Sequence, residues 1–448
     1  MRIIIAGAGS VGFHLAELLT AESHDIVLID TSKDRLEYAE SHLDISAVRG
    51  DSTSFAVLDQ AGITDADLLI AVTSLGDTNI TTAIIGKRMG AKKTIVRIKN
   101  MEYLIDKSRF DLREVGIDAL VSPESLAARE IRRLLKESAV TDSFDFEDGK
   151  LSLIGLYVTD KAPIIGKTLI ETRHLNPKNN FITVALQRDG EEIIPRGKTE
   201  FKLNDHVYFI TRADSIEEAL IFTGNKRVEI NNVMVLGGSR TGAHIARRMS
   251  NGYNIKLIDK DRKKAISLAE ELDNVMVING DGTDIELLDE EGIDYMDAFV
   301  AVTGNSETNI LSCLVAKNRG VKKTIALIEN REYIKLSENF GIDAMINKKI
   351  IAANFMFKYI REGDVVSLTG IYGMDAEILE FNVTADCLIT KEKIKDLKFP
   401  EKAIIGGVIR DDVGFITLGD FQIQEGDKVV VFTMSKGIKQ VEKFFKRR

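Results

Sequence analysis

The chain opens with Met1-Arg2-Ile3-Ile4-Ile5-Ala6-Gly7-Ala8-Gly9-Ser10-Val11-Gly12. The apolar run from Ile3 to Ala6 has the length of a buried parallel strand, and the apolar periodicity that follows predicts a helix. Between them stands Gly-x-Gly-x-x-Gly, the spacing of a dinucleotide-binding turn. In such a turn the first glycine permits the tight reversal, the second lets the backbone approach a phosphate, and the third lets helix and strand pack closely. The free N–H groups of the helix and its positive dipole end would then face the anion.

A second predicted strand, 25–29, ends in Asp30, 18 residues after Gly12. An acidic residue near this distance bonds the adenosine ribose hydroxyls in dinucleotide-binding folds. With such an acid and no nearby arginine pocket for a 2′-phosphate, the pattern favours NAD(H) over NADP(H). ATP and ADP carry the same ribose and remain open, and a purely structural glycine turn is the alternative.

Short apolar runs alternate with helical segments as far as residue 121. We predict strands at 45–48, 67–72, 92–98 and 119–121, and helices at 34–39, 55–61, 79–89, 104–115 and 124–137. This alternation predicts an α/β fold, a Rossmann-like doubly wound parallel sheet with helices on both faces. Ligands bind at the carboxyl ends of such strands. The candidate residues there are Asp51, Thr73, Ser74 and Arg97, beside Gly7 to Gly12 and Asp30.

The same alternation of strands and helices then recurs, and Gly237 corresponds to Gly7 at an offset of 230 residues. After each predicted sheet domain, short alternating strands with a hairpin signal indicate a small α+β lobe; the signals are Arg188-Asp189-Gly190 and Arg410-Asp411-Asp412. The chain is therefore predicted to be a tandem duplication of a Rossmann-like domain and a small lobe, with domains at 1–140, 141–225, 231–362 and 363–448.

The second phosphate turn departs from the first at two informative positions. Ser239 stands in place of Gly9 and crowds a phosphate, and Leu327 stands in place of Arg97 and cannot pair with one. Arg240, in place of Ser10, could restore positive charge at the helix N-terminus. Either this site binds more weakly or binds a different nucleotide, or it is a degenerate scaffold copy. Its candidate residues are Gly237, Gly238, Ser239, Arg240, Thr241, Asp259, Asp281 and Thr303.

Composition excludes several classes of function. A net charge of -9 argues against a broad nucleic-acid-binding face. Cys313 and Cys387 are too few for a disulfide framework or a zinc cage, so a reducing cytoplasm is expected. No apolar run approaches the length of about 18 residues needed to span a membrane. The apolar stripes of the helices expected at 124–137 and 352–361 either cross to a neighbouring domain or pack within their own lobe.

Catalytic motifs are not evident. The six histidines lack metal-ligand spacing, and neither a nucleophile elbow nor a Gly-Lys-Ser/Thr phosphate loop is present. His14 and His244 occupy matching helix positions, where a packed histidine and a proton shuttle are the two interpretations. The small lobes offer no general base for a nicotinamide. We therefore expect a non-enzymatic protein that senses its nucleotide, with a soluble NAD-dependent oxidoreductase as the alternative.

The strand before Gly7, the phosphate turn, Ile29-Asp30, Gly50-Asp51, Thr73 and Arg97 resemble the regulator-of-potassium-conductance (RCK) domain. Two complete copies are similar to the peripheral NAD-binding subunits of bacterial and archaeal Trk potassium-uptake systems. The resemblance implies a ring of subunits under the cytoplasmic face of a potassium-translocating membrane subunit on another chain. Nucleotide binding, by NAD(H), ATP or ADP, would alter the ring and gate the pore. The resemblance assigns the phosphate loop to residues 7–11, the ribose acid to Asp30 and the basic contact to Arg97.

Overall fold

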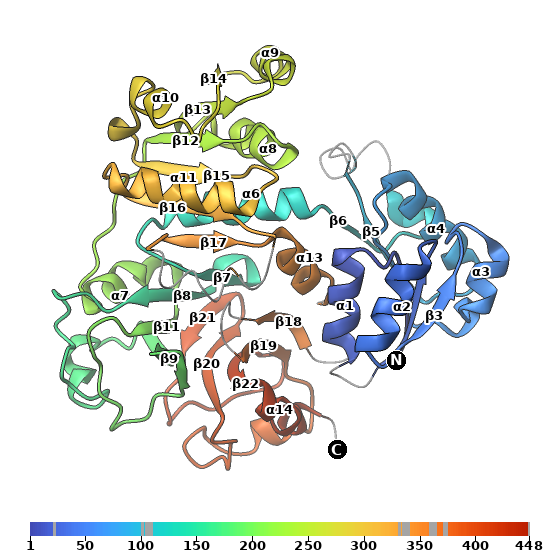
Figure 1. The fold of residues 1–448 in the computed structure, drawn as a ribbon. Coiled ribbons are helices and arrows are strands. Elements are labelled where there is room, and N and C mark those ends of the chain that lie inside the picture. Colours follow the sequence, from blue (N-terminus) through green and yellow to red (C-terminus); the bar gives the residue numbers. More distant parts are fainter. Residues whose placement is uncertain are drawn as a thin grey trace. The chain divides into compact units, whose positions relative to one another are not determined.

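A computed structural model describes residues 1–20, 24–99, 103, 111–329, 333, 341–357, 365–370 and 375–446 of the protein. By their internal contacts these residues form two compact units, whose elements are labelled in Figure 1. The first unit comprises Met1–Arg129 and Asn347–Ile360, and the second comprises Glu130–Ile346 and Arg361–Arg448. The predicted division into four domains follows the sequence and stays a prediction.

The first unit holds a six-stranded parallel sheet with the strand order β3-β2-β1-β4-β5-β6. Its strands are β1 (Arg2–Ala6), β2 (Asp25–Asp30), β3 (Ser46–Arg49), β4 (Leu68–Ala71), β5 (Lys93–Arg97) and β6 (Ala119–Val121). The helices that follow them are α1 (Ser10–Thr20), α2 (Lys33–His42), α3 (Phe55–Gln60), α4 (Gly76–Met89) and α6 (Pro123–Lys136). The strands expected from the apolar runs are thus confirmed, and α4 begins three residues before its predicted start. The helix expected at 104–115 lies largely outside the described residues.

A second parallel sheet, in the second unit, repeats this topology with the order β14-β13-β12-β15-β16-β17. Its strands are β12 (Asn232–Leu236), β13 (Asn254–Asp259), β14 (Val275–Asn279), β15 (Ala298–Ala301), β16 (Lys323–Leu327) and β17 (Ala344–Ile346). The helices that follow its strands are α8 (Arg240–Met249), α9 (Arg262–Glu271), α10 (Ile285–Glu290) and α11 (Ser306–Asn318). The helix α13 (Lys348–Phe357) follows β17 in the chain but lies in the first unit. In both sheets the central strands are buried along their length because helices cover both faces.

Each parallel sheet is followed in the chain by a five-stranded antiparallel sheet, and both of these lie in the second unit. The first contains β7 (Ser143–Phe146), β8 (Leu151–Tyr157), β9 (Phe181–Arg188), β10 (Glu191–Ile193) and β11 (His206–Thr211), with α7 (Ile216–Phe222). The second contains β18 (Val365–Gly370), β19 (Ala376–Asn382), β20 (Ala403–Arg410), β21 (Val413–Ile416) and β22 (Lys428–Met434), with α14 (Ile438–Phe445). The predicted hairpin turns are confirmed at Asp189 and Asp411, which have φ of 51° and 49°.

The two small sheets share one hydrophobic core. Phe146, Leu153 and Tyr208 of the first small lobe pack with Ile378 and Phe432 of the second, and all five side chains are buried. Because the duplicated lobes bury their apolar faces against each other, each lobe supplies the surface that its copy needs. The tandem duplication therefore packs as an internal pseudo-dimer in this part of the chain.

Helix α13 belongs to the second copy by sequence but to the first unit by contact. It packs against α1, the helix that follows the first phosphate turn. Ala352, Ala353 and Met356 of α13 are fully buried. Of the two interpretations of its apolar stripe, crossing to another domain is confirmed for α13. The first nucleotide-binding helix thus carries an element contributed by the second copy.

Candidate functional site

The first glycine turn joins β1 to α1 in a geometry that requires two of its glycines. Gly7 has a φ of +115°, and a Cβ on it would lie 2.8 Å from the backbone N of Thr73. A Cβ on Gly12 would lie 1.8 Å from the carbonyl oxygen of Gly7, so helix and strand could not approach as they do. The predicted roles of these two residues, the turn and the close packing, are confirmed. Around Gly9, by contrast, a Cβ would meet no described atom within 4 Å, which leaves room at the helix N-terminus for a ligand.

Asp30, at the end of β2, is held directly beside this turn. Its Oδ2 accepts a hydrogen bond of 2.7 Å from the N–H of Ala8, and its Oδ1 accepts one of 2.8 Å from the N–H of Ser32. A carboxylate offers about four acceptor positions, so about two remain for ligand hydroxyls. One arginine lies near this carboxylate: Nη1 of the exposed Arg35 is 3.8 Å from Oδ2 of Asp30.

The end of β4 is fixed to the end of β5 by a side chain that the sequence analysis did not single out. Oδ1 of the buried Asn79 accepts hydrogen bonds from the backbone N and from Oγ1 of Thr73, at 2.8 and 2.6 Å. Nδ2 of Asn79 donates to the carbonyl oxygens of Thr73 and Arg97, at 3.2 and 2.9 Å. Asn79 therefore fixes the ends of β4 and β5 beside β1, where the strand order reverses between β1 and β4. Doubly wound sheets bind ligands in a crevice at this point, which we call the first crevice. Its repetition as Asn309 at the 230-residue offset is the signal in the sequence.

Arg97 ends β5 with an incompletely satisfied guanidinium. Its Nη2 is 4.0 Å from Oε1 of Glu124, the second residue of α6. Nε of Arg97 and Oε2 of Glu124 are buried and have no hydrogen-bond partner among the described residues. Buried polar atoms are normally paired, so a pair in this state at a crevice is what an absent polar ligand would leave.

Two further predicted residues, Asp51 and Ser74, make no hydrogen bond to Asp30, Thr73 or Arg97 among the described residues. Oδ1 of Asp51 accepts hydrogen bonds from the backbone N and Oγ1 of Thr53, which lower the pKa of Asp51 and orient its own turn. Ser74 is exposed after the end of β4. His14, on α1, is buried with its Nδ1 2.9 Å from Oε2 of Glu17, which favours the packed interpretation over a proton shuttle.

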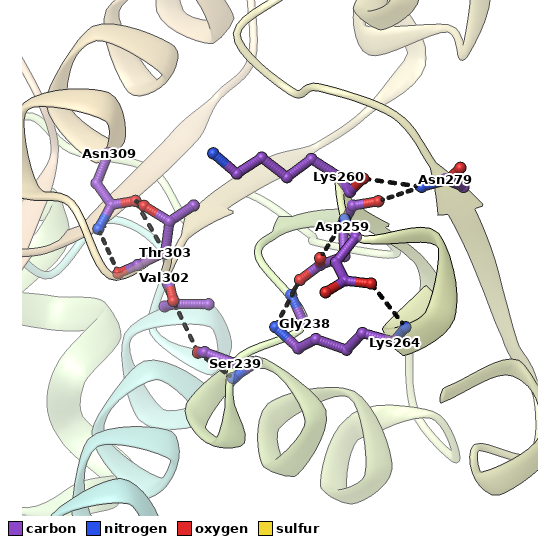
Figure 2. Close-up of polar contacts among 11 residues, drawn as sticks. Gly238, Ser239, Asp259, Lys260, Lys264, Asn279, Val302, Thr303 and Asn309 are labelled. Atoms are coloured by element: carbon purple, nitrogen blue, oxygen red, sulfur yellow. Dashed lines mark hydrogen bonds and ion pairs between the residues drawn. The ribbon is translucent and has the colours of Figure 1, made fainter. Parts of the chain in front are cut away.

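The second copy reproduces the scaffold of this site. Gly237 has a φ of +102°, and a Cβ on Gly242 would lie 1.9 Å from the carbonyl oxygen of Gly237. Figure 2 shows Asn309 bonded to Thr303 as Asn79 is to Thr73. Nδ2 of Asn309 likewise donates to the carbonyl oxygen of Leu327, at 2.7 Å. Oδ1 of Asp281, like that of Asp51, accepts from the following threonine, Thr283.

The second copy differs from the first in what fills the crevice. Oγ of Ser239 donates to the carbonyl oxygen of Val302 at 2.8 Å, and Nζ of Lys264 donates to Oδ2 of Asp259 at 2.8 Å (Figure 2). Burial by itself raises the pKa of the Asp259 carboxyl, but the bonds from Lys264 and the backbone outweigh it and hold the pKa below its ordinary value. The sequence analysis identified Ser239 and missed Lys264. Lys264 follows Asp259 by five residues, and the conformation of the turn between β13 and α9 decides whether its side chain reaches back to the carboxylate.

Fold and site together define a class of protein: two Rossmann-type domains, each with a glycine turn at its crevice and each followed by a small antiparallel lobe. Comparison with known families agrees with this arrangement. The TrkA-N domain family matches residues 3–123 and 233–348, and the TrkA-C domain family matches residues 153–221 and 378–446. The chain belongs to the TrkA family.

Relatives match over the full length of the chain. A "Trk system potassium uptake protein TrkA homolog" from Archaeoglobus fulgidus is 33% identical, with 100% of both chains covered. The "Trk system potassium uptake protein TrkA" from Vibrio alginolyticus is 32% identical, with 99% of this chain and 98% of the relative covered.

Among solved structures, the GsuK channel bound to NAD has a TM-score of 0.62 at 17% identity, with 99% of this chain and 78% of that chain covered. GsuK bound to ADP has a TM-score of 0.51 at 15% identity, with 80% and 69% covered. At these identities the structures support the fold alone. Among the described residues, no helix is long and apolar enough to cross a membrane.

Proposed function

We propose that this protein is the nucleotide-sensing regulatory subunit of a Trk-type potassium-uptake system. The observation that carries the proposal is the turn between β1 and α1, at the first crevice: a Cβ on Gly9 would meet no described atom within 4 Å, and two strands of the same parallel sheet end in the oppositely charged Asp30 and Arg97. In a chain whose relatives are named for potassium uptake, such a crevice suits a ligand that reports on the state of the cell.

The proposed ligand is NAD(H), with ATP and ADP as alternatives that share its ribose. The N–H groups at the start of α1, with residues 7–12, would bind the pyrophosphate. Asp30 would accept from the ribose hydroxyls, Arg97 would pair with a phosphate, and Thr73, Ser74 and Asp51 would line the strand ends. GsuK, which shares the fold, has been solved with NAD and with ADP.

The proposed partner is a potassium-translocating membrane subunit on a separate chain, which this protein would bind from the cytoplasmic side as a ring of subunits. A nucleotide can shift such a ring only by binding one of its states better. The crevice supplies a place for that difference, because α13 from the second copy packs on the helix that begins at the phosphate turn. The mechanism needs no chemical step on the nucleotide.

Calorimetric titration of the full chain with NADH, NAD, NADPH, ATP and ADP tests the binding claim. We expect saturable binding of at least one nucleotide, lost in Asp30→Ala. The absence of binding by all five would refute the proposal. The oxidoreductase alternative is tested by incubation with NADH and candidate keto acids: enzymatic consumption of NADH would establish it and displace a purely regulatory role.

A further inference from the structure

The two crevices share a scaffold but differ in hydrogen-bonding capacity. In both copies the threonine that follows β4 or β15 is held by the same asparagine contacts, and the glycines at the turn and at the helix start are equivalent. Four side chains near the turn and the strand ends differ: Ser239, Lys264, Leu327 and Arg240 stand in place of Gly9, Arg35, Arg97 and Ser10. Each of these side chains can be compared with the ligand contact that is expected at the same place in the first copy.

Ser239 replaces the phosphate contact. Its Oγ accepts from the backbone N of Gly242 at 3.3 Å, and so caps α8, while donating to the carbonyl oxygen of Val302 at 2.8 Å. The hydroxyl therefore bridges the start of α8 and the end of β15, the strand beside β12. In the first copy Gly9 has no side chain with which to make either bond. A bound phosphate oxygen would accept from the same helix N-terminus.

Lys264 replaces a ribose contact. Oδ2 of Asp259 accepts both from the N–H of Gly238 at 2.7 Å and from Nζ of Lys264 at 2.8 Å, and Oδ1 accepts from the N–H of Asp261 at 2.9 Å. About three of the four acceptor positions of this carboxylate are used, so it cannot accept from both hydroxyls of a ribose. Asp30, in the first copy, retains about two, because Nη1 of Arg35, the residue equivalent to Lys264, is 3.8 Å from Oδ2 of Asp30 and makes no hydrogen bond to it.

The cation that would pair with a phosphate is also gone from the end of the fifth strand. Leu327, at the end of β16, is buried and apolar. Arg240, the residue expected to restore positive charge, is exposed at the first position of α8, as Ser10 is in α1. It has no hydrogen bond or ion pair with any residue that the structure describes.

We propose that the second crevice is an internally occupied nucleotide site, in which the Ser239 hydroxyl stands for a phosphate oxygen and the Lys264 ammonium for a ribose hydroxyl. This inference rests on the proposed function of the first crevice. Of the alternatives stated for the second copy, the inference favours a scaffold that binds no nucleotide. The hydrogen bonds of Ser239 and Lys264 permanently take the place of those that a nucleotide would make in the second domain. Each chain therefore responds only to the nucleotide that the first crevice binds.

The test is calorimetric titration with NADH in a chain whose first site is disabled by Asp30→Ala. We expect no binding in this variant. Adding Ser239→Gly and Lys264→Met should free the helix N-terminus and the carboxylate, and should create binding that approaches one NADH per chain. Lys263→Met is the matched control for Lys264→Met, because Lys263 is an exposed lysine in the same turn. Combined with Ser239→Gly, it should leave the site closed. Circular dichroism and melting temperature establish that each variant is folded.

Two results would overturn the inference. One is binding of two NADH molecules per wild-type chain, with residual binding in Asp30→Ala; this would leave the proposed function intact. The other is a folded opened variant that still binds no NADH, which would mean that these two side chains do not close the site. Failure of the proposed function is distinguishable, because the wild-type chain would then bind no nucleotide.

Discussion

Oδ2 of Asp30 accepts a hydrogen bond of 2.7 Å from the backbone N–H of Ala8. This bond ties the acid at the end of β2 to the middle of the phosphate turn, 22 residues earlier in the chain. The two parts of a dinucleotide site, one for ribose and one for phosphate, are thereby held together before any ligand arrives. Such preorganisation lowers the cost of ordering the site on binding.

The first prediction concerns Asp30. Asp30→Ala should weaken nucleotide binding at least about tenfold, because a hydrogen bond to a charged group contributes ~1.5–3 kcal/mol and two ribose bonds would be lost. Asp25→Ala is the control, since Asp25 is an exposed carboxylate at the start of the same strand. Calorimetry measures both, and equal affinities for the two folded variants would contradict the assignment of Asp30.

A pair of glycine substitutions should separate binding from stability. Gly9→Ala should leave the free energy of unfolding within ~0.5 kcal/mol of wild type, because its Cβ meets no described atom within 4 Å, yet it should weaken nucleotide binding. Gly12→Ala should destabilise the chain by about 1–3 kcal/mol or more, because its Cβ would collide with the carbonyl oxygen of Gly7. Urea unfolding and calorimetry measure the two effects. A Gly9→Ala chain with unchanged affinity would argue against a phosphate at this position.

The third prediction concerns a duplicated ion pair in the small lobes. Arg188 makes two hydrogen bonds with the buried Asp205, at 2.6 and 2.7 Å, and Arg410 makes the same pair with Asp427. Asp205→Ala should cost ~1–3 kcal/mol or more, because it leaves the partly buried guanidinium of Arg188 and the N–H of Lys202 without their acceptor. The exposed pair of Arg212 with Asp214 is the control, and Asp214→Ala should cost ~0–1 kcal/mol. Similar losses of stability in both variants would show that burial of the pair does not matter.

The pH dependence of stability should reveal Lys323. Burial lowers its pKa to about 8, against the attraction of Asp343 and Asp142 and with the repulsion of Lys317, and its Nζ donates to the carbonyl oxygen of Val140. In the unfolded chain a lysine titrates near pH ~10.4, so between about 8 and 10 the unfolded state binds more protons. This group's contribution to stability therefore rises with pH across that window and is lost as the pH falls through about 8.

Lys323→Met should remove that rise, whereas Lys93→Met, at the equivalent exposed position of the first copy, should retain it. Urea unfolding of the wild type and both variants across the window measures the difference. Parallel stability curves for wild type and Lys323→Met would contradict the lowered pKa of Lys323.

Features of the fold that depend on residues close together in the sequence could be predicted from the sequence alone. The burial of Leu68–Ala71 follows from an uninterrupted apolar run, and the need for glycine at Gly12 follows from its spacing after Gly7. Because the sequence pattern repeats at an offset of 230 residues, the second parallel sheet could be predicted from the first. These features require no knowledge of which distant residues meet.

Other features depend on contacts that a linear pattern does not specify. The apolar stripe of α13 indicates that one face is buried, but only the folded chain shows that α1 covers it. A serine at position 239 is enough to predict that a phosphate would be crowded there. The hydrogen bond from Ser239 to Val302, however, depends on β15 lying beside β12. The pairing of Lys264 with Asp259 likewise depends on where the first turn of α9 lies.

The central claim is that nucleotide binding in the first crevice regulates potassium transport by a partner, and potassium flux tests it most directly. The full chain and a Trk-type membrane subunit would be reconstituted in lipid vesicles, with flux measured with and without the nucleotide that calorimetry identifies. We predict that the nucleotide changes the flux with the wild-type chain and leaves it unchanged with Asp30→Ala, although both chains bind the membrane subunit. An equal response with Asp30→Ala, or no response with the wild-type chain bound, would contradict the account.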